Sequence, residues 1–159
     1  MRDSVTLDAT DSRLLAEIQK NAMLTAQDLG DRLNLSASQA ARRRQRLETE
    51  GYITGYRATL APEKIGLAVE AFIQVAMAAH TEQNATDFLR LARARPEIVA
   101  AWTLTGEADY LLRVWCADLA ALNRLVQQFL LPHPAVARVQ SQIVLDRIKT
   151  DAPLPIGPS

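Results

Sequence analysis

Apolar residues recur every three to four positions through the first fifty residues of the chain, which is the spacing of amphipathic helices. The pattern predicts three helices, over residues 7–20, 25–33 and 36–50. Thr25 with Asp28, and Ser36 with Gln39, have the spacing of capping boxes, which mark where the second and third helices begin. The short turn between these helices, at Asn34, indicates a helix-turn-helix unit.

The remainder of the chain alternates between strand-like and helix-like patterns. Strands are predicted over residues 67–79, 98–105, 110–116 and 136–148, and helices over 84–95 and 118–131. This order, β-α-β-β-α-β, is typical of a ferredoxin-like α/β sandwich. We therefore expect an α+β protein with a winged helix-turn-helix domain at 1–51, a connecting strand or linker at 52–66, a ferredoxin-like ligand-sensing and oligomerisation domain at 67–149, and a disordered proline-rich tail at 150–159.

The first predicted strand of the second domain is apolar on both faces. Val69, Ile73 and Val75 lie on one face, whereas Phe72 and Ala76 lie on the other. Two helices can cover only one face of a four-stranded sheet. A second copy of the same sheet is the most economical cover for the other face, so we expect a homodimer.

Composition narrows the class of protein. The chain has 159 residues, with 18 basic and 18 acidic side chains, so its net charge indicates no partner. Its single cysteine, Cys116, excludes an internal disulfide and suits a reducing cytoplasm. The most apolar stretch, residues 65–79, is too short to span a bilayer, and no membrane association is expected. His80 and His133 are far apart, so we expect no metal site and no cofactor.

The third predicted helix contains four arginines and no acid before Glu48. At 100° per residue, Ala40, Arg44 and Leu47 face the core, whereas Arg42 and Arg46 face outward. Arg44 therefore has to lie along the edge of the domain with its stem buried, and Glu48 is a candidate partner four residues on.

The outward face of this helix has the composition of a DNA-reading surface. Arginine pairs bidentately with guanine and glutamine with adenine, and a recognition helix presents its N-terminal residues to base edges. The predicted base contacts are Ser38, Gln39 and Arg42. The predicted phosphate contacts are Arg43, Arg46 and the capping residue Ser36. The expected partner is double-stranded DNA.

The chain resembles the Lrp/AsnC, or feast/famine, family of transcriptional regulators across nearly its whole length. The matching segments are LDATDSRLLAEIQKNA, LSASQAARRRQRLETEGYITGY, the Leu60-Ala61-Pro62 connector, PEIV at 96–99 and LTGEADY at 104–110. The resemblance implies a helix-turn-helix domain joined to a ligand-sensing domain. It also implies dimers that assemble further, often to octamers, and an amino-acid effector bound between neighbouring dimers.

The family's Gly-x-x-Asp turn maps onto Gly106 and Asp109 of this chain. Gly106 would let a ligand approach the backbone, the turn amides could hold a carboxylate, and Asp109 could pair with an ammonium group. The predicted effector contacts are Thr105, Gly106, Glu107, Ala108 and Asp109, with Gln140 and Ser141 on the far wall. A hairpin turn without a ligand is the alternative.

Two other functions share this layout. Sirohaem decarboxylases resemble it, but a tetrapyrrole pocket calls for histidines and arginines gathered together, and this chain has only two histidines. An effector-independent architectural DNA-binding protein is the other alternative. The basic outward helix favours a regulator that is not an enzyme.

Overall fold

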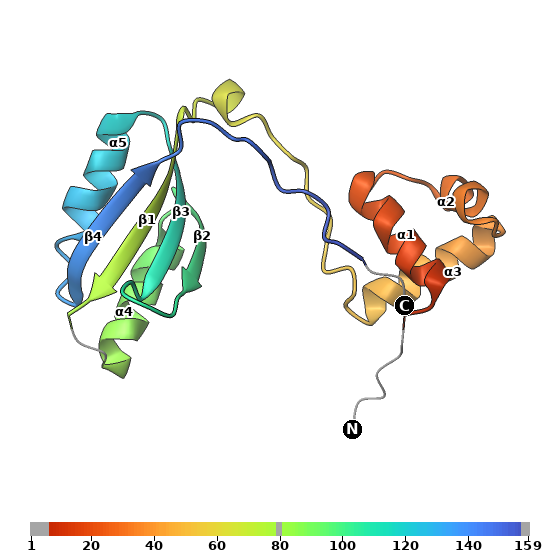
Figure 1. Cartoon of the computed structure of the whole chain (residues 1–159), viewed down its shortest axis with the longest axis horizontal. Helices are drawn as coiled ribbons and strands as arrows, with labels where there is room; N and C mark the ends of the chain where they lie inside the picture. Colours follow the sequence, from red (N-terminus) through yellow and green to blue (C-terminus); the bar gives the residue numbers. More distant parts are fainter. Residues whose placement is uncertain (1–6, 79–80, 157–159) are drawn as a thin grey trace. The chain divides into compact units, whose positions relative to one another are not determined.

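The computed structural model describes residues 7–78 and 81–156, so Ala79, at the end of the first predicted strand, and His80 lie outside the described residues. The chain forms two compact units, which are Met1–Thr59 with Lys149–Ser159, and Leu60–Ile148 (Figure 1). By this grouping, residues 52–59 cluster with the first unit.

Three helices build the first unit. They are α1 (Ala9–Lys20), α2 (Ala26–Leu33) and α3 (Ala37–Thr49). Both predicted capping boxes are present at α2 and α3, and Asp8 with Asp11 forms a third at α1. Each box satisfies amide groups that a helix start would otherwise leave unpaired. The core of this unit consists of Leu14, Ile18, Leu24, Leu29, Leu33, Ala40 and Leu47.

The turn between α2 and α3 depends on two residues. Asn34 ends α2 in the left-handed conformation, at φ 57°, which asparagine tolerates better than most residues. Gly30 lies where α2 meets the turn, and a Cβ atom there would come within 2.7 Å of the Leu35 carbonyl oxygen. A side chain at position 30 would therefore push the two helices apart.

Residues 52–60 form no strand, which corrects the predicted wing or connecting strand. The part of the first unit that the structure describes has helices and offers no sheet edge, so the β-prone residues of this segment have no neighbouring strand with which to pair. The segment returns beneath α3 instead. The Ile53 amide donates to the Leu47 carbonyl oxygen at 3.1 Å, and the Ile53 side chain packs on the helical core.

The second unit is a four-stranded antiparallel sheet with helices between its strands. Its elements are the short η1 (Pro62–Ile65), β1 (Val69–Met77), α4 (Glu82–Ala94), β2 (Ile98–Thr103), β3 (Tyr110–Cys116), α5 (Leu119–Arg124), η2 (Leu125–Leu130) and β4 (Val136–Ile143). The strand order is β2-β3-β1-β4. This arrangement confirms the predicted ferredoxin-like order, although β4 is shorter than expected.

Both helical segments cover the same face of the sheet. Ile73 and Val75 of β1 share one core with Phe88 of α4 and with Leu122 and Leu125 of α5 and η2. η2 is a π-helical turn where a continuous α-helix was predicted. Among the described residues, no helix is long and apolar enough to cross a membrane.

The other face of the sheet remains open at its centre. By strand register, Trp102 lies opposite Leu111, which in turn lies opposite Gln74. The Trp102 side chain is 46% exposed. At one end of this face the Arg147 guanidinium covers the Trp115 ring, at 4.9 Å from its centroid, and so buries it.

The C-terminal segment returns to the first unit, whereas a disordered tail was expected from residue 150. Residues 150–156 contain no helix or strand, yet the Gln19 side chain pairs with the Leu154 backbone. Gln19 accepts from the Leu154 amide at 2.7 Å and donates to its carbonyl oxygen at 3.2 Å. Residues 157–159 of the predicted tail lie outside the described part of the chain.

Candidate functional site

The N-terminal half of α3 presents polar side chains to solvent. Ser38, Gln39 and Arg42 are all exposed, as the helical geometry predicted. Ser36 caps the helix by accepting from the Gln39 amide at 3.2 Å, and the Gln39 carboxamide oxygen accepts from the Ser36 amide at 3.0 Å. These side chains therefore begin from a backbone that the capping box already orders.

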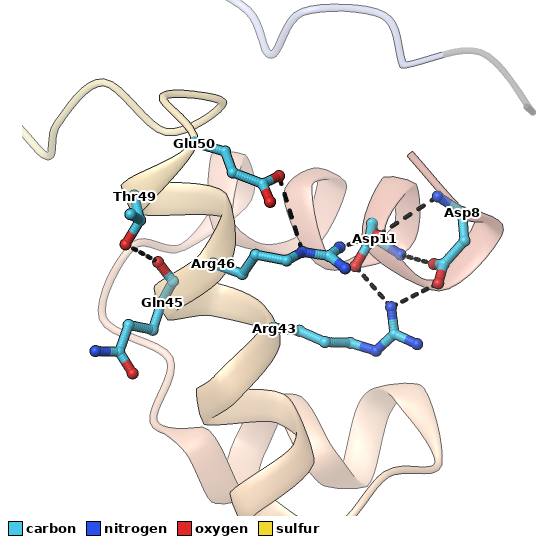
Figure 2. A network of polar contacts seen from close by, with 7 residues as sticks. All are labelled: Asp8, Asp11, Arg43, Gln45, Arg46, Thr49 and Glu50. Atoms are coloured by element: carbon cyan, nitrogen blue, oxygen red, sulfur yellow. Dashed lines mark hydrogen bonds and ion pairs between the residues drawn. The ribbon is translucent and has the colours of Figure 1, made fainter. Parts of the chain in front are cut away.

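Arg43 and Arg46 differ from Arg42 because both reach back to the start of α1 (Figure 2). Arg43 Nη1 lies 2.6 Å from Asp8 Oδ2 and 2.7 Å from Asp11 Oδ1. Arg46 Nη2 donates to Asp11 Oδ2, and its Nε lies 3.9 Å from Glu50. This geometry corrects the expectation that Arg46 simply points outward, since its side chain is only partly exposed and its head group is paired within the domain.

The contact of the two acids of this network with α3 was not predicted from the sequence. Asp8 and Asp11 stand three residues apart at the start of α1, and Arg43 and Arg46 stand three residues apart on α3. This equal spacing is consistent with two ion pairs between the helices. It could not be recognised in advance, because the two pairs lie more than thirty residues apart and meet only when α1 packs against α3. The hydrogen bond from the Asp11 amide and the pairing with Arg43 lower the pKa of the Asp8 carboxyl.

Arg44 occupies the core side of α3, as predicted, and its charge is fully accommodated there. Its Nε lies 3.1 Å from Glu48, the predicted partner, and 3.0 Å from the Tyr56 hydroxyl. Its Nη1 donates to the Leu24 carbonyl oxygen at 2.9 Å. The guanidinium also lies over the Tyr56 ring, 4.9 Å from its centroid.

The turn between β2 and β3 holds Gly106 in a backbone conformation that favours glycine. Gly106 has a φ of 118°, a value that side-chain-bearing residues rarely adopt. The Leu104 amide donates to the Asp109 carbonyl oxygen at 2.8 Å, which closes the turn. Thr105, Gly106 and Glu107 are exposed, whereas Ala108 is buried.

Asp109 anchors this turn to β1 and borders a small cavity. Its Oδ2 accepts from the Met77 amide at 2.7 Å, and its own amide donates to the Val75 carbonyl oxygen at 2.9 Å. The cavity has a volume of about 250 Å³ and is lined by Met77, Thr81, Glu82, Ala85, Thr103, Asp109 and Tyr110. Of the seven predicted effector contacts, only Asp109 lines it.

Gln140 and Ser141 lie on β4, away from this cavity. Gln140 is opposite Gln74 and Ser141 is opposite Ile73 in the register of β1 with β4. Consecutive strand residues point to opposite faces, so these two side chains cannot line the same wall. The residue of β4 that does reach the turn is Arg138, whose Nη2 lies 3.6 Å from Glu107.

The chain matches two protein families over nearly all of its length. Residues 7–54 match a winged helix-turn-helix DNA-binding domain, and residues 70–154 match the Lrp/AsnC ligand binding domain. It is 33% identical to the DNA-binding transcriptional activator DecR of Escherichia coli (strain K12), over 94% of this chain and 99% of that protein.

Solved structures agree with this assignment. A transcriptional regulator from Neisseria meningitidis in complex with L-Met is 39% identical, with a TM-score of 0.90 over 94% of this chain and 97% of that one. An AsnC family transcriptional regulator from Agrobacterium tumefaciens is 29% identical, with a TM-score of 0.86 over 93% and 96% of the two chains. The chain belongs to the Lrp/AsnC family of DNA-binding transcriptional regulators.

Proposed function

We propose that α3 reads DNA through Ser38, Gln39 and Arg42, with Ser36 at a phosphate. The observation that carries this proposal is the exposure of all three reading side chains on the N-terminal half of a capped helix. Arginine and glutamine provide the bidentate donors and acceptors that distinguish bases in the major groove. A dimer would present two such helices to half-sites about one helical turn apart.

Arg43 and Arg46 enter this proposal in a different way from Arg42. Their head groups are engaged by Asp8, Asp11 and Glu50, so either arginine would have to share or release a carboxylate to bind a phosphate. We therefore assign base reading to the three exposed residues, and phosphate contact by Arg43 and Arg46 stays a prediction.

Selection of bound sequences from random DNA, with and without a pool of amino acids, tests DNA reading and effector response together. We expect a roughly palindromic site for the wild-type protein. Arg42→Ala should relax base preference at one position and weaken binding by about 1–3 kcal/mol. Unchanged selectivity in this variant would contradict the assignment of Arg42.

We also propose that an amino acid is the effector and that it binds at the 105–109 turn. The Neisseria meningitidis relative in complex with L-Met supports an amino-acid ligand. The turn around Gly106 is made of exposed residues whose amides suit a carboxylate, and the acids Asp109 and Glu82 beside the cavity suit an ammonium group. A thermal-shift series over the amino acids tests binding. Asp109→Ala should abolish the shift and leave DNA affinity unchanged, whereas an undiminished shift would exclude this turn.

The open sheet face supports a homodimer. Its further assembly to an octamer is what the family resemblance implies, and a cytoplasmic location is proposed from the single cysteine. Trp102, Leu111 and Phe72 give this face an apolar centre, and the equivalent face of a second copy is a cover of matching chemistry. Light scattering at micromolar concentration measures the mass directly. A clean monomer would contradict the dimer.

A further inference from the structure

One carboxylate of α1 holds two arginines of the recognition helix. The Asp11 side chain is only 1% exposed, and its two oxygens accept separately (Figure 2). One accepts from Arg43 at 2.7 Å, and the other from Arg46 and, at 3.4 Å, from the Asp8 amide of the α1 capping box. Asp8 adds a second contact to Arg43 at 2.6 Å. The cluster therefore joins the N-cap residue and the first turn of α1 to the middle of α3.

This cluster constrains a helix whose apolar contact with the core is narrow. The buried residues of α3 are Ala40 and Leu47 alone, and alanine provides little surface. On the same side of α3, Arg44 adds polar contacts to Leu24 and Tyr56. The pairs with Asp11 fix the helix through two further positions. Ion pairs between Asp11 and residues 32 and 35 positions away resist rotation of the helix about its axis directly, because a buried carboxylate that loses its partners is costly.

The rotation of α3 matters because the predicted reading residues lie on its surface. A turn of the helix by one residue position would move every outward side chain by about 100°. The same two arginines, if they were released, would also become free cations beside the DNA. Free cations bind phosphates without regard to sequence, and this raises non-specific affinity.

We propose that Asp11 is a positioning residue for DNA recognition. It sets the rotation of α3 so that Ser38, Gln39 and Arg42 face the bases, and it withholds Arg43 and Arg46 from non-specific phosphate binding. The first part of this role rests on the base contacts proposed above. Asp11 itself touches no DNA.

Asp11→Asn in the full-length protein tests the proposal, because it removes the charge and keeps the size of the side chain. Binding is measured to duplexes enriched by the wild-type protein from random DNA, and to random-sequence duplexes of the same length, over a range of salt. We expect the ratio of the two affinities to fall on the order of tenfold, the size of one lost base contact. Binding to the random duplex should not weaken, and its salt dependence should steepen by roughly 0.9 for each arginine that gains a phosphate.

Asp31→Asn is the matched control, because Asp31 is an exposed acid of the same unit that accepts a hydrogen bond from the Gln27 side chain at 2.9 Å and not from an arginine of α3. It makes the same change in net charge. An equal fall of the affinity ratio in this control would overturn the proposal in favour of a general charge effect. An equal loss of both affinities in Asp11→Asn would reduce its role to folding alone.

Arg42→Gln and Arg43→Gln provide a second comparison that does not depend on how well the Asp11 variant folds. They remove the same charge at neighbouring positions. We expect Arg43→Gln to lower the ratio of the affinities for selected and random duplexes. The salt dependence of its binding to random DNA should stay unchanged. A flattening of the salt dependence by about 0.9 would identify Arg43 as a direct phosphate contact and overturn the proposed role of Asp11. Unchanged base preference in Arg42→Gln, with an altered ratio in Asp11→Asn, would instead count against the proposed base contacts.

Discussion

Arg44 is a charged residue on the core side of the recognition helix, and its surroundings explain how the domain tolerates it. Glu48, Tyr56 and the Leu24 carbonyl oxygen all contact its guanidinium group. The partner four residues away followed from helical spacing. The other two did not, because they lie 12 and 20 residues away and meet Arg44 only after the chain has folded back on α3.

Replacing Arg44 should lower the stability of the domain and affect DNA binding less. Arg44→Ala leaves the Leu24 carbonyl oxygen and the Tyr56 hydroxyl without this partner, so we expect the free energy of unfolding to fall by about 1–3 kcal/mol. Urea denaturation followed by circular dichroism measures the change. Gln45→Ala, at the exposed neighbouring position, should stay within about 0.5 kcal/mol, and an equal loss in both variants would contradict a specific role.

Acid should weaken the first unit through Asp8. The folded state lowers the pKa of this carboxyl, first through the Asp11 amide and then through Arg43, so the stabilisation is present above the unfolded pKa of about 3.9. It is lost as pH falls through the lower folded value. The melting temperature measured from pH 5 to pH 2 should therefore fall less steeply in Asp8→Asn than in the wild type. Parallel curves would show that Asp8 contributes nothing.

Among the elements, the helix starts followed most directly from the sequence. The α2 and α3 capping boxes were predicted residue by residue because a cap is a local interaction between positions three apart. The ion network of Asp8 and Asp11 with α3 was not predicted, since it depends on how two helices pack. The order of strands was predicted from the alternation of the pattern, whereas the extended segment 52–60 was wrongly given strand character.

The π-helical turn η2 has a physical reason that periodicity alone did not reveal. Leu122 and Leu125 face the core three positions apart, but the next buried residue is Leu130, five positions on. A regular helix would bring residue 129 to the core in its place. The wider turn is closed by the Leu131 amide, which donates to the Val126 carbonyl oxygen at 2.9 Å, and it buries Leu130. It leaves the Phe129 ring beneath the Arg95 guanidinium, whose carbon lies 3.1 Å from the ring centroid.

The α2–α3 turn makes a prediction at the scale of elements. Gly30→Ala places a Cβ atom 2.7 Å from the Leu35 carbonyl oxygen, so the backbone has to shift, and we expect a loss of about 1–3 kcal/mol. Chemical denaturation gives the value. Gln27→Ala on the exposed side of the same helix is the control and should change stability by less than about 0.5 kcal/mol. A neutral Gly30→Ala would mean that the two helices separate without cost.

For the molecule as a whole, the open sheet face predicts how assembly should respond to a single charge. Trp102→Glu places a carboxylate at an exposed apolar position of that face, and should raise the dimer dissociation constant on the order of thirtyfold, since an interface tryptophan commonly contributes about 2 kcal/mol or more. Light scattering over a dilution series measures it. Leu119→Glu, exposed at the start of α5, is the control, and equal dissociation in both would place the interface elsewhere.

The first unit is built from two separate segments of the chain. The chain leaves the DNA-binding unit after Thr59, builds the ligand-binding unit, and re-enters the first unit at Lys149, where Gln19 holds Leu154. The ligand-binding unit is therefore an insertion inside the other, joined to it by two peptide segments. A protease nick within residues 52–59 cuts one of these two segments, and across it the Gln19–Leu154 contact joins the fragments by two exposed hydrogen bonds, each contributing about 0.5–1.5 kcal/mol. Nicked protein should therefore separate into two fragments on gel filtration without denaturant, whereas a single eluting species would show that the C-terminal segment is held by more than these bonds.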